Sequence, residues 1–93
     1  MRHIESSVVF RKQLKLMLRR GKGEEQIKKV ILLLANDQAL AAKYHDHPLT
    51  GQFTGFRDCH IQPDWVLIYK KMDSEDSLGI LRLEETGTHA DLF

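Results

Sequence analysis

The fold of this chain is decided by residues 56–70, which read FRDCHIQPDWVLIYK. The segment Trp65–Lys71 is dense in β-branched and aromatic residues, which favour strands. Pro63 stands just before it, where a turn is expected. We therefore predict two antiparallel strands, Phe56–Ile61 and Trp65–Lys71, joined by a short turn that contains Pro63.

Upstream of this hairpin, apolar residues recur at the spacing of an amphipathic helix in two segments. The first helix is expected over about residues 7–20, with Ser6 or Ser7 as its N-cap and Gly21 as its C-terminal stop. The second is expected over Glu24–Ala35, where two glutamates occupy the first turn. Because only Gly-Lys-Gly joins them, the helices should pack as an antiparallel hairpin.

The remaining segments complete an α+β pattern. A short strand is expected at residues 3–5, and a third strand of the sheet over residues 78–84, reached through a polar turn at residues 73–77. Residues 36–44 should form a loop with one more helical turn, residues 45–55 an irregular, site-forming loop, and residues 88–93 a short tail. The predicted fold class is α+β: a short N-terminal strand and a helix hairpin packed on one face of a twisted antiparallel sheet, whose other face is open for function.

The composition fits a single domain spanning residues 1–93. Of the 93 residues, 42% are hydrophobic and 29% are charged, a balance that can bury one core. The longest apolar run, Val30–Ala35, is far shorter than the roughly 20 residues of a membrane span, and no signal-peptide pattern is present. We therefore expect a cytoplasmic protein without a membrane partner. Cys59 is the only cysteine, which excludes an intrachain disulfide and a multi-cysteine zinc site.

The charge is unevenly divided along the chain, although its net value is only +1. Residues 1–50 hold ten Lys/Arg against five Asp/Glu, whereas residues 51–93 hold four against eight. The first helix and the residues just after it carry only basic charges: Arg11, Lys12, Lys15, Arg19, Arg20 and Lys22. This face is expected to meet nucleic-acid phosphates or an acidic partner, the alternative being an ordinary solvated helix face.

The second half of the chain gathers the candidate catalytic residues. The five histidines are His3, His45, His47, His60 and His89. Across the predicted turn, His60 and Trp65 should lie opposite each other, with Asp64 beside them. His47 in the irregular loop and His89 just past the last strand could reach the same patch.

This set suits metal-free cleavage of RNA, in which a deprotonated 2′-OH attacks the adjacent phosphorus and the 5′-oxygen leaves with a proton. Histidine, with an ordinary pKa of about 6.5, supplies both protonation states near neutral pH. Asp64 could act as a base or orient a histidine, and Arg57 or a protonated histidine could stabilise the charge on the phosphorane. Trp65 and Phe93 offer rings on which unpaired bases could stack.

Each of these residues also has a structural explanation. The loop histidines could be surface residues, and His60 could be a strand residue with a satisfied ring. Asp64 could belong to the turn, Trp65 to the core and Phe93 to a docked tail. A zinc site built from the histidines matches no ligand spacing that we can defend, so we expect neither a metal nor another cofactor.

Three motifs of the second half resemble those of YafQ-type toxins of the RelE/ParE superfamily. They are Asp46-His47-Pro48-Leu49, the R-D-x-H-x-x-P-D-W pattern of residues 57–65, and the T-G-T-H-x-x-L-F pattern of residues 86–93. The motifs occur in the expected order and at about the expected separations. The resemblance covers residues 44–93 and, for the helical half, rests on the helix pattern alone.

The resemblance implies a RelE-like, microbial-ribonuclease-like fold and the toxin of a bacterial type II toxin–antitoxin system. Such a toxin is an mRNA interferase, a ribosome-dependent endoribonuclease that cuts the message in the A site and inhibits translation. The positions that match the family's catalytic set are His47, His60, Asp64 and His89, and Trp65 and Phe93 match its RNA-supporting aromatic residues. We expect Asp64 or His60 to take the 2′-OH proton. We expect His89 to protonate the leaving oxygen and His47 to stabilise the phosphate.

The implied partners are the ribosome with its mRNA and a DinJ-like ribbon-helix-helix antitoxin, with operator DNA bound only through the antitoxin. The basic first helix would face ribosomal RNA or the acidic tail of the antitoxin. One alternative is a ParE-like gyrase-inhibiting toxin, which shares the fold but needs no acid–base set. The other is a catalytically silent module that binds the antitoxin. The histidine and aspartate set argues against the ParE-like alternative.

Overall fold

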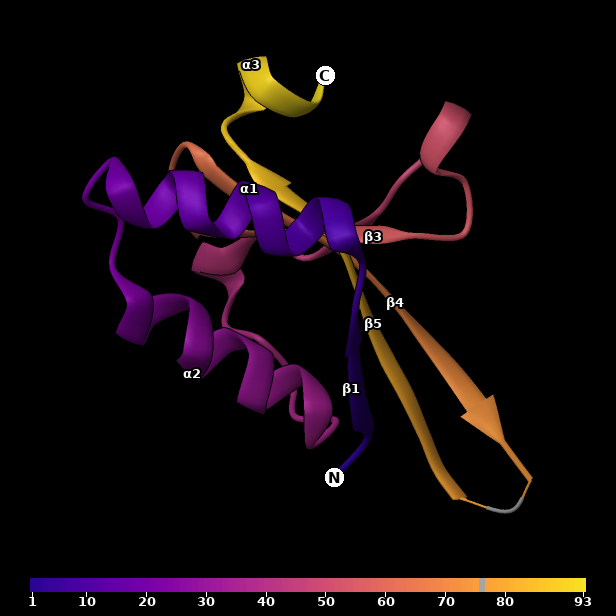
Figure 1. Ribbon diagram of the computed structural model, residues 1–93. Coiled ribbons are helices and arrows are strands. Elements are labelled where there is room, and N and C mark those ends of the chain that lie inside the picture. The colour runs from indigo at the N-terminus through magenta and orange to yellow at the C-terminus, as the bar shows by residue number, and fades with distance from the viewer. Residues whose placement is uncertain (76) are drawn as a thin grey trace.

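The computed structural model describes residues 1–75 and 77–93, and within them a five-stranded sheet has the order β1-β5-β4-β3-β2. The strands are β1 (His3–Ser6), β2 (His47–Pro48), β3 (Arg57–Gln62), β4 (Trp65–Ser74) and β5 (Ser77–Gly87). The helices are α1 (Val8–Arg19), α2 (Glu24–Ala35) and α3 (His89–Leu92), with short 3-10 helices η1 (Ala42–Tyr44) and η2 (Gly51–Phe53). Figure 1 shows how these elements are arranged. No helix in the described part of the chain is long and apolar enough to cross a membrane.

The two predicted helices form as their capping and spacing indicate. Ser7, the N-cap of α1, accepts a hydrogen bond from the Phe10 N–H at 2.8 Å and donates one to the Glu84 carbonyl at 2.6 Å. The cap therefore also ties α1 to β5. After α1, Gly21 adopts a left-handed conformation with φ of +87°, which favours glycine, and the chain then turns into α2.

The α+β class and the twisted, largely antiparallel sheet are confirmed. The direction in which β1 pairs was not predicted. β1 runs parallel to β5, whereas the other neighbouring strands are antiparallel. The chain leaves β1 through α1 and α2 and returns to the sheet at the opposite edge, which leaves β1 at the edge beside β5. Such a long-range direction is not encoded in the local periodicity of the sequence.

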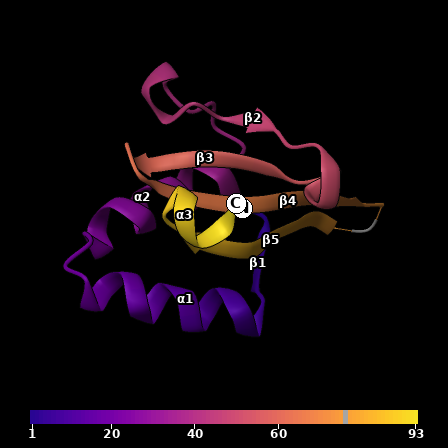
Figure 2. The same cartoon turned by 90° about the horizontal axis from the view of Figure 1, so that it is seen from above.

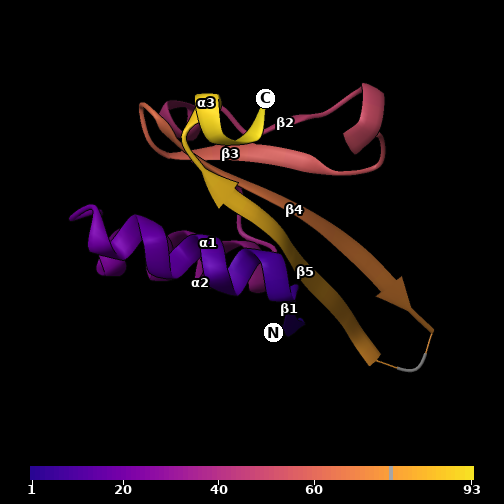
Figure 3. The same ribbon diagram turned by 45° about the horizontal axis from the view of Figure 1, so that its top comes forward.

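Alternation along the central strands gives the sheet two different faces. The main core, shared with α1 and α2, consists of Phe10, Met17, Ile27, Val30, Leu34, Ala35, Cys59, Ile61, Trp65, Leu67, Tyr69, Leu81 and Leu83. The other face carries a smaller apolar cluster of Val66, Ile68 and Leu92, on which Leu49, Phe53 and Phe56 pack. Figure 3 shows α3 on this second side, opposite α1 and α2. The second face was predicted to be open, but the smaller cluster covers part of it.

The β4–β5 hairpin is longer than predicted. Of the polar turn expected at residues 73–77, Asp73 and Ser74 belong to β4 and Ser77 to β5, and Asp76 lies outside the described residues. Figure 1 shows this hairpin extending beyond the other strands. The loop expected over residues 36–55 contains η1, the two-residue strand β2 and η2.

The tail predicted at residues 88–93 contains a helical turn, α3. Thr88 and Asp91 form a capping box: the Thr88 hydroxyl accepts from the Asp91 N–H at 3.2 Å, and the Asp91 carboxylate accepts from the Thr88 N–H at 3.0 Å. Arg20 forms an ion pair with Asp91 at 2.8 Å, and Arg20, followed by Thr88, lowers the pKa of Asp91 to about 2. This ion pair links α3 to the end of α1.

The register of the β3–β4 hairpin differs from the prediction. His60 pairs with Val66, while Trp65 pairs with Gln62, and the register shifts between His60 and Gln62. Trp65 therefore points into the main core, and its predicted position opposite His60 is wrong. A β-bulge adds a residue to one strand, and strict alternation cannot reveal where it occurs.

The Trp65 indole is fully buried and is held by Thr86. The indole N–H donates to the Thr86 hydroxyl at 2.9 Å, and that hydroxyl donates to the Val66 carbonyl at 2.8 Å. A buried indole N–H needs such a partner, since an unpaired donor in the core lowers stability. Thr86 therefore fixes the orientation of the largest side chain of the core.

We expect Thr86→Val to lower the free energy of unfolding by about 1–3 kcal/mol, because the Trp65 N–H would stay buried without an acceptor. Each kcal/mol lowers the Tm of a chain of this size by roughly 4–8 °C, which thermal unfolding would measure. In a Trp65→Phe background the cost of Thr86→Val should be smaller than in the wild type, because no donor is then left unpaired. A Thr86→Val protein as stable as the wild type would contradict this assignment.

Candidate active site

A continuous row of rings crosses the end of the molecule where α3 lies. Neighbouring ring centroids are 5.2 Å apart for His45 and His60, 5.0 Å for His60 and His89, 6.2 Å for His89 and Phe93, and 6.0 Å for Phe93 and Phe53. Figure 2, which looks onto this end, shows α3 lying over strands β4 and β5, with β3 beside it. Segments that are far apart in the sequence thus bring their rings to one surface.

His89 is oriented by Asp64, which lies in the turn between β3 and β4. The Asp64 carboxylate accepts a hydrogen bond from the His89 backbone N–H at 3.1 Å and lies 2.8 Å from His89 Nδ1. The hydrogen bonds from the His89 ring and backbone lower the pKa of Asp64. A charged carboxylate only accepts hydrogen bonds, so Nδ1 carries the proton and Nε2 faces away from Asp64.

His47 is held on β2 by two neighbours. Its Nδ1 lies 2.6 Å from the His45 carbonyl oxygen and 3.2 Å from Asp58 Oδ1, and β2 pairs His47 with Asp58. Both neighbouring atoms are acceptors, so Nδ1 donates and Nε2 is left available at the surface. The His47 side chain is 49% exposed, whereas that of Asp58 is only 5% exposed.

Asp58 is a buried carboxylate beneath the histidines, and the sequence reasoning did not select it. Among the described residues, no donor makes a hydrogen bond of good geometry to its Oδ1 atom. Burial raises the pKa of Asp58, while electrostatic interactions with the rings of His47, His60 and His89 oppose that rise. Its signal in the sequence was its place two residues before His60, which puts both side chains on the same face of a strand.

His60 is half-buried at the centre of the row. Burial lowers the pKa of His60, the charges of His89, His45 and His47 act in the same direction, and Asp58 opposes them. Within the described part of the chain, no hydrogen bond to the His60 ring is present. His60 therefore presents a neutral imidazole that can accept a proton near neutral pH.

The structure brings together the four residues that were predicted to be catalytic, His47, His60, Asp64 and His89. Phe93 is 60% exposed beside His89, so its ring is accessible to an unpaired base. Trp65 is not accessible, because its ring lies in the main core. The predicted stacking role of Trp65 is therefore wrong for this fold.

Arg57 lies on the opposite face of β3 from His60. It is paired with Tyr69, and its Nε lies 3.2 Å from Asp46, which also accepts from the Tyr69 hydroxyl at 2.5 Å. Burial opposes the charge of Arg57, but Asp46 and Tyr69 outweigh it and raise the pKa of Arg57. The predicted contact of Arg57 with the scissile phosphate is therefore not supported by the structure.

The basic residues of the first helix lie exposed along α1: Arg11, Lys12, Lys15 and Arg19. Arg11 also donates to the Ser6 carbonyl at 2.7 Å, which anchors the start of this face. At the other end, the charge of Lys22 contributes to the lowered pKa of Asp64. The basic face thus leads from β1 to the edge of the histidine cluster, and its contact with RNA stays a prediction.

The arrangement supplies acid–base chemistry. In residues 1–75 and 77–93, no group of three or more His, Cys, Asp or Glu side chains is placed to hold a metal ion. Cys59 is fully buried, and burial raises the pKa of its thiol, so it is not a nucleophile. What the surface offers is a neutral imidazole next to an imidazole that is oriented by a carboxylate.

Comparison with known proteins identifies the family. The model of the family described as "Bacterial toxin of type II toxin-antitoxin system, YafQ" matches residues 2–93. The mRNA interferase toxin YafQ of Escherichia coli K12 is 46% identical over 93 residues, which cover 99% of this chain and 96% of that protein.

Solved structures agree with this match. The crystal structure of YafQ from Escherichia coli BL21(DE3) has a TM-score of 0.87 at 44% identity and covers 100% of this chain and 99% of that one. A chain of the Escherichia coli DinJ-YafQ toxin-antitoxin complex has a TM-score of 0.84 at 45% identity, with 99% of this chain and 97% of that one covered. The resemblance seen in the motifs of the second half is therefore confirmed over the whole chain, which belongs to the YafQ family of bacterial type II toxin–antitoxin toxins.

Proposed function

We propose that this chain is an mRNA interferase, an endoribonuclease that cuts mRNA in the ribosomal A site and thereby inhibits translation. The observation that carries the proposal is the pair His60 and His89, whose ring centroids lie 5.0 Å apart in different environments. The environment of His60 favours the neutral ring, whereas His89 is oriented by the charged Asp64. Metal-free cleavage of RNA needs such a proton acceptor and proton donor on either side of one phosphate.

The family supports this reading of the site. The Escherichia coli relative is named an mRNA interferase toxin, and it is similar to this chain over nearly its whole length. We infer that residues 1–93 form one toxin domain. Because the imidazoles, the carboxylate and the ring of Phe93 lie on one surface, the same domain can bind the message and cut it.

His60 is better suited than Asp64 to take the proton of the 2′-OH. Asp64 already accepts two hydrogen bonds from His89, and its lowered pKa makes it a weak base. The ring of His60 is neutral and has no hydrogen-bond partner among the described residues. Geometry and protonation state therefore both favour His60 as the general base.

The reaction follows from these roles. His60 accepts the 2′-OH proton, the 2′-oxygen bonds to phosphorus, and the bond from phosphorus to the 5′-oxygen breaks as His89 Nε2 donates a proton to that oxygen. Asp64 holds a negative charge against Nδ1 of the ring that carries this proton. The expected products are a 2′,3′-cyclic phosphate and a free 5′-OH.

His47 and Asp58 complete the site. His47 Nε2 is directed away from the two acceptors that hold its Nδ1, so a protonated His47 can stabilise the charge that develops on the phosphate. Asp58 acts through the histidines, as a positioning residue that holds His47 and places a negative charge beneath the cluster. These two residues take the role that was expected of Arg57.

The partners follow from the family and from the basic face of α1. Escherichia coli YafQ forms a complex with DinJ. We infer that a DinJ-like ribbon-helix-helix antitoxin sequesters this toxin and is the only route by which it meets operator DNA. The basic residues of α1 meet ribosomal RNA or an acidic segment of the antitoxin. A toxin that works on translating ribosomes acts in the cytoplasm.

We expect the purified protein to stop translation in a cell-free extract and to cut the message within codons. His60→Ala and His89→Ala should each lower the cleavage rate by roughly 10²–10⁴-fold, because each removes one proton-transfer group. His3→Ala is the matched control, since His3 is exposed on β1 away from the cluster. Primer extension on the message measures the rates. Uncut message together with inhibited DNA supercoiling would instead favour a ParE-like toxin.

The pH dependence of the cleavage rate should report the protonation of the general base, His60. Activity should rise with pH through the pKa of His60, which lies below the ordinary histidine value of about 6.5, because the base must be neutral. His60→Ala should remove this limb from the profile of single-turnover cleavage. An acidic limb that is centred above the ordinary histidine value would contradict the assignment of His60.

We expect naked RNA to be cut far more slowly than ribosome-bound mRNA, because the ribosome orders the strand that the toxin alone would have to hold. Rates on the same message with and without programmed ribosomes measure the difference. Equal rates on both substrates would overturn the ribosome dependence while leaving the nuclease chemistry intact.

Asp58→Asn should separate stability from activity. The folded pKa of Asp58 lies above its unfolded value, so its contribution to stability is present at low pH and is lost as the pH rises through the folded pKa. The asparagine side chain does not ionise and so avoids this loss of stability. The Tm of the variant should therefore exceed that of the wild type at neutral pH, and exceed it by less near pH 4. Its cleavage rate should fall, because His47 loses a charged partner. A variant that is both less stable and inactive would point to a purely structural role.

A further inference from the structure

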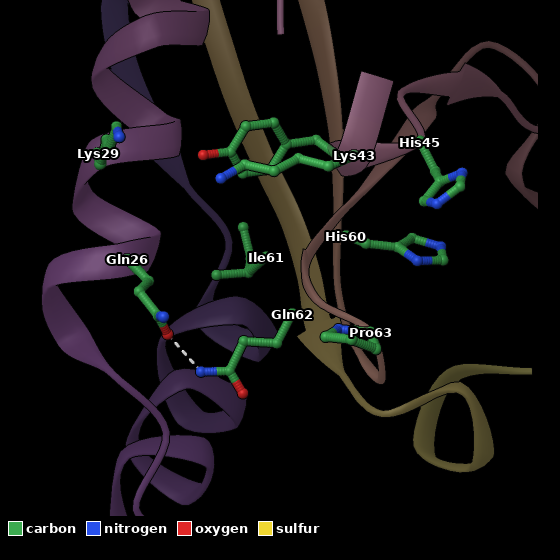
Figure 4. Close-up of a pocket in the computed structure, with 9 residues that line it drawn as sticks. Gln26, Lys29, Lys43, His45, His60, Ile61, Gln62 and Pro63 are labelled. Atoms are coloured by element: carbon green, nitrogen blue, oxygen red, sulfur yellow. Dashed lines mark hydrogen bonds between the residues drawn. The ribbon is translucent and has the colours of Figure 1, made fainter. Parts of the chain in front are cut away.

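A pocket of about 600 Å³ adjoins the catalytic cluster, and of the side chains that line it the mechanism above uses only His60. Its walls come from α2 through Gln26 and Lys29, from η1 through Lys43 and Tyr44, and from the end of β3 through Gln62. Figure 4 shows the α2 residues facing β3 across the pocket. The volume lies within the range of sites that hold a small ligand.

The pocket lies at the outer edge of β3, beyond its pairing with β2. β2 pairs only with Arg57 and Asp58, so beyond Asp58 no strand in the described part of the chain lies along the outer edge of β3. A polar ligand can therefore approach both the side chains and the backbone of this edge. Ile61, which lines the pocket between α2 and β3, supplies an apolar surface there.

The pocket is continuous with the site of cleavage. His45 and His60 both line it, and Figure 4 shows their rings side by side at its rim. His60 is also the proposed general base and lies next to His89. A chain whose phosphate lies between His60 and His89 can therefore place its adjacent nucleotide in the pocket.

The charge of the pocket suits an anionic ligand. Lys29 and Lys43 line it, and none of the described residues around it is acidic. The Lys43 ammonium lies 5.1 Å from the centroid of the Tyr44 ring, which keeps it near the wall. Positive side chains in this position would attract the phosphate that precedes the bound nucleotide.

The side-chain amides of Gln26 and Gln62 suit a nucleobase. The Gln62 amide donates to the Gln26 carbonyl oxygen across the pocket, as Figure 4 shows. This bond leaves the amide of Gln26 as a donor and the carbonyl of Gln62 as an acceptor, without other partners among the described residues. The free amide of Gln26 and the free carbonyl of Gln62 can each bind a polar atom on the edge of a base in single-stranded RNA.

We propose that this pocket binds the nucleotide on the 5′ side of the scissile phosphate and that Gln26 and Gln62 read its base. The proposal rests on the proposed nuclease function and adds the direction in which the RNA strand crosses the site. The nucleotide that carries the attacking 2′-OH must lie on the side of the general base, His60, where the pocket is. The nucleotide that follows the cut then lies toward His89 and the exposed ring of Phe93.

The test uses product-like nucleotides as probes. A nucleoside 3′-monophosphate resembles the end that is left on the 5′ side, whereas a nucleoside 5′-monophosphate resembles the 3′ side. In NMR titrations of the full chain, 3′-monophosphates should shift the side-chain amide signals of Gln26 and Gln62. The 5′-monophosphates should instead shift the signals of Phe93 and its neighbour Phe53. Inorganic phosphate should move the histidine signals alone.

Variants sharpen the test. Gln26→Ala should weaken the binding of a 3′-monophosphate by roughly 2- to 10-fold, the worth of a neutral hydrogen bond, and leave the binding of inorganic phosphate unchanged. Lys29→Ala should lower the cleavage of ribosome-bound message mainly by raising KM. Lys28→Ala is the matched control, because this exposed neighbour on α2 is paired with Glu24 at 3.3 Å and does not line the pocket.

The outcomes separate this proposal from the nuclease function. If the message is cut but 3′-monophosphates leave the Gln26 and Gln62 signals unmoved, the pocket proposal fails and the nuclease function stands. The pocket proposal also fails if 5′-monophosphates shift these signals instead. It fails as well if Gln26→Ala weakens binding to the antitoxin and leaves nucleotide binding unchanged. If the message is not cut at all, the nuclease function fails and the pocket proposal fails with it.

Discussion

The alternation of side chains along β3 and β4 is the constraint on which both the core and the site depend. On one face Cys59 and Leu67 enter the core shared with α1 and α2, and on the other face Asp58 and His60 support the polar surface. A shift by one residue would exchange the two sets and bury the catalytic groups in an apolar core. Thr86, on β5, helps to hold β4 in this orientation, because it bonds both the Trp65 indole and the Val66 carbonyl.

The site combines groups whose surroundings drive their protonation in different directions. Burial lowers the pKa of His60 and raises that of Asp58, whereas the hydrogen bonds from His89 lower that of Asp64. Neighbouring groups with such opposed environments are what acid–base catalysis requires at one pH. Burial disfavours the charged form of Asp58, so its ionisation costs the fold stability, which is common at functional sites. The capping box of α3 and its ion pair with Arg20 hold His89 in place despite this loss.

Much of the fold could be predicted from local sequence patterns. The helices follow from apolar spacing and caps, and Ser7 performs the capping role that its position indicated. The parallel pairing of β1 and the bulge near Gln62 could not be predicted, because each depends on contacts between distant segments. Trp65 lies in the core because His60 pairs with Val66, which puts Trp65 on the same face of β4 as Leu67 and Tyr69. The Thr-x-x-Asp pattern that begins at Thr88, in contrast, is a helix-capping signal in the sequence, although only a short tail is predicted there.

The candidate site was predicted in its residue types but not in its full extent. The motifs named His47, His60 and His89 with Asp64, and the structure gathers these side chains on one surface. Asp58 was missed because its burial depends on the pairing of β2, a strand of only two residues. Arg57 was included because basic residues suit phosphate, but strand alternation turns it toward Asp46. Residue type is thus readable from the motif, whereas the face that a residue occupies depends on the sheet.

The central claim is that His60 is neutral and available while His89 is held by Asp64 through its Nδ1 proton. Nitrogen NMR of the imidazole rings across a pH titration tests it most directly, since the shifts report both the pKa and the tautomer of each ring. The account predicts that His60 titrates below the ordinary value of about 6.5 and that neutral His89 carries its proton on Nδ1. A His60 that titrates above that value, or a neutral His89 protonated on Nε2, would contradict it.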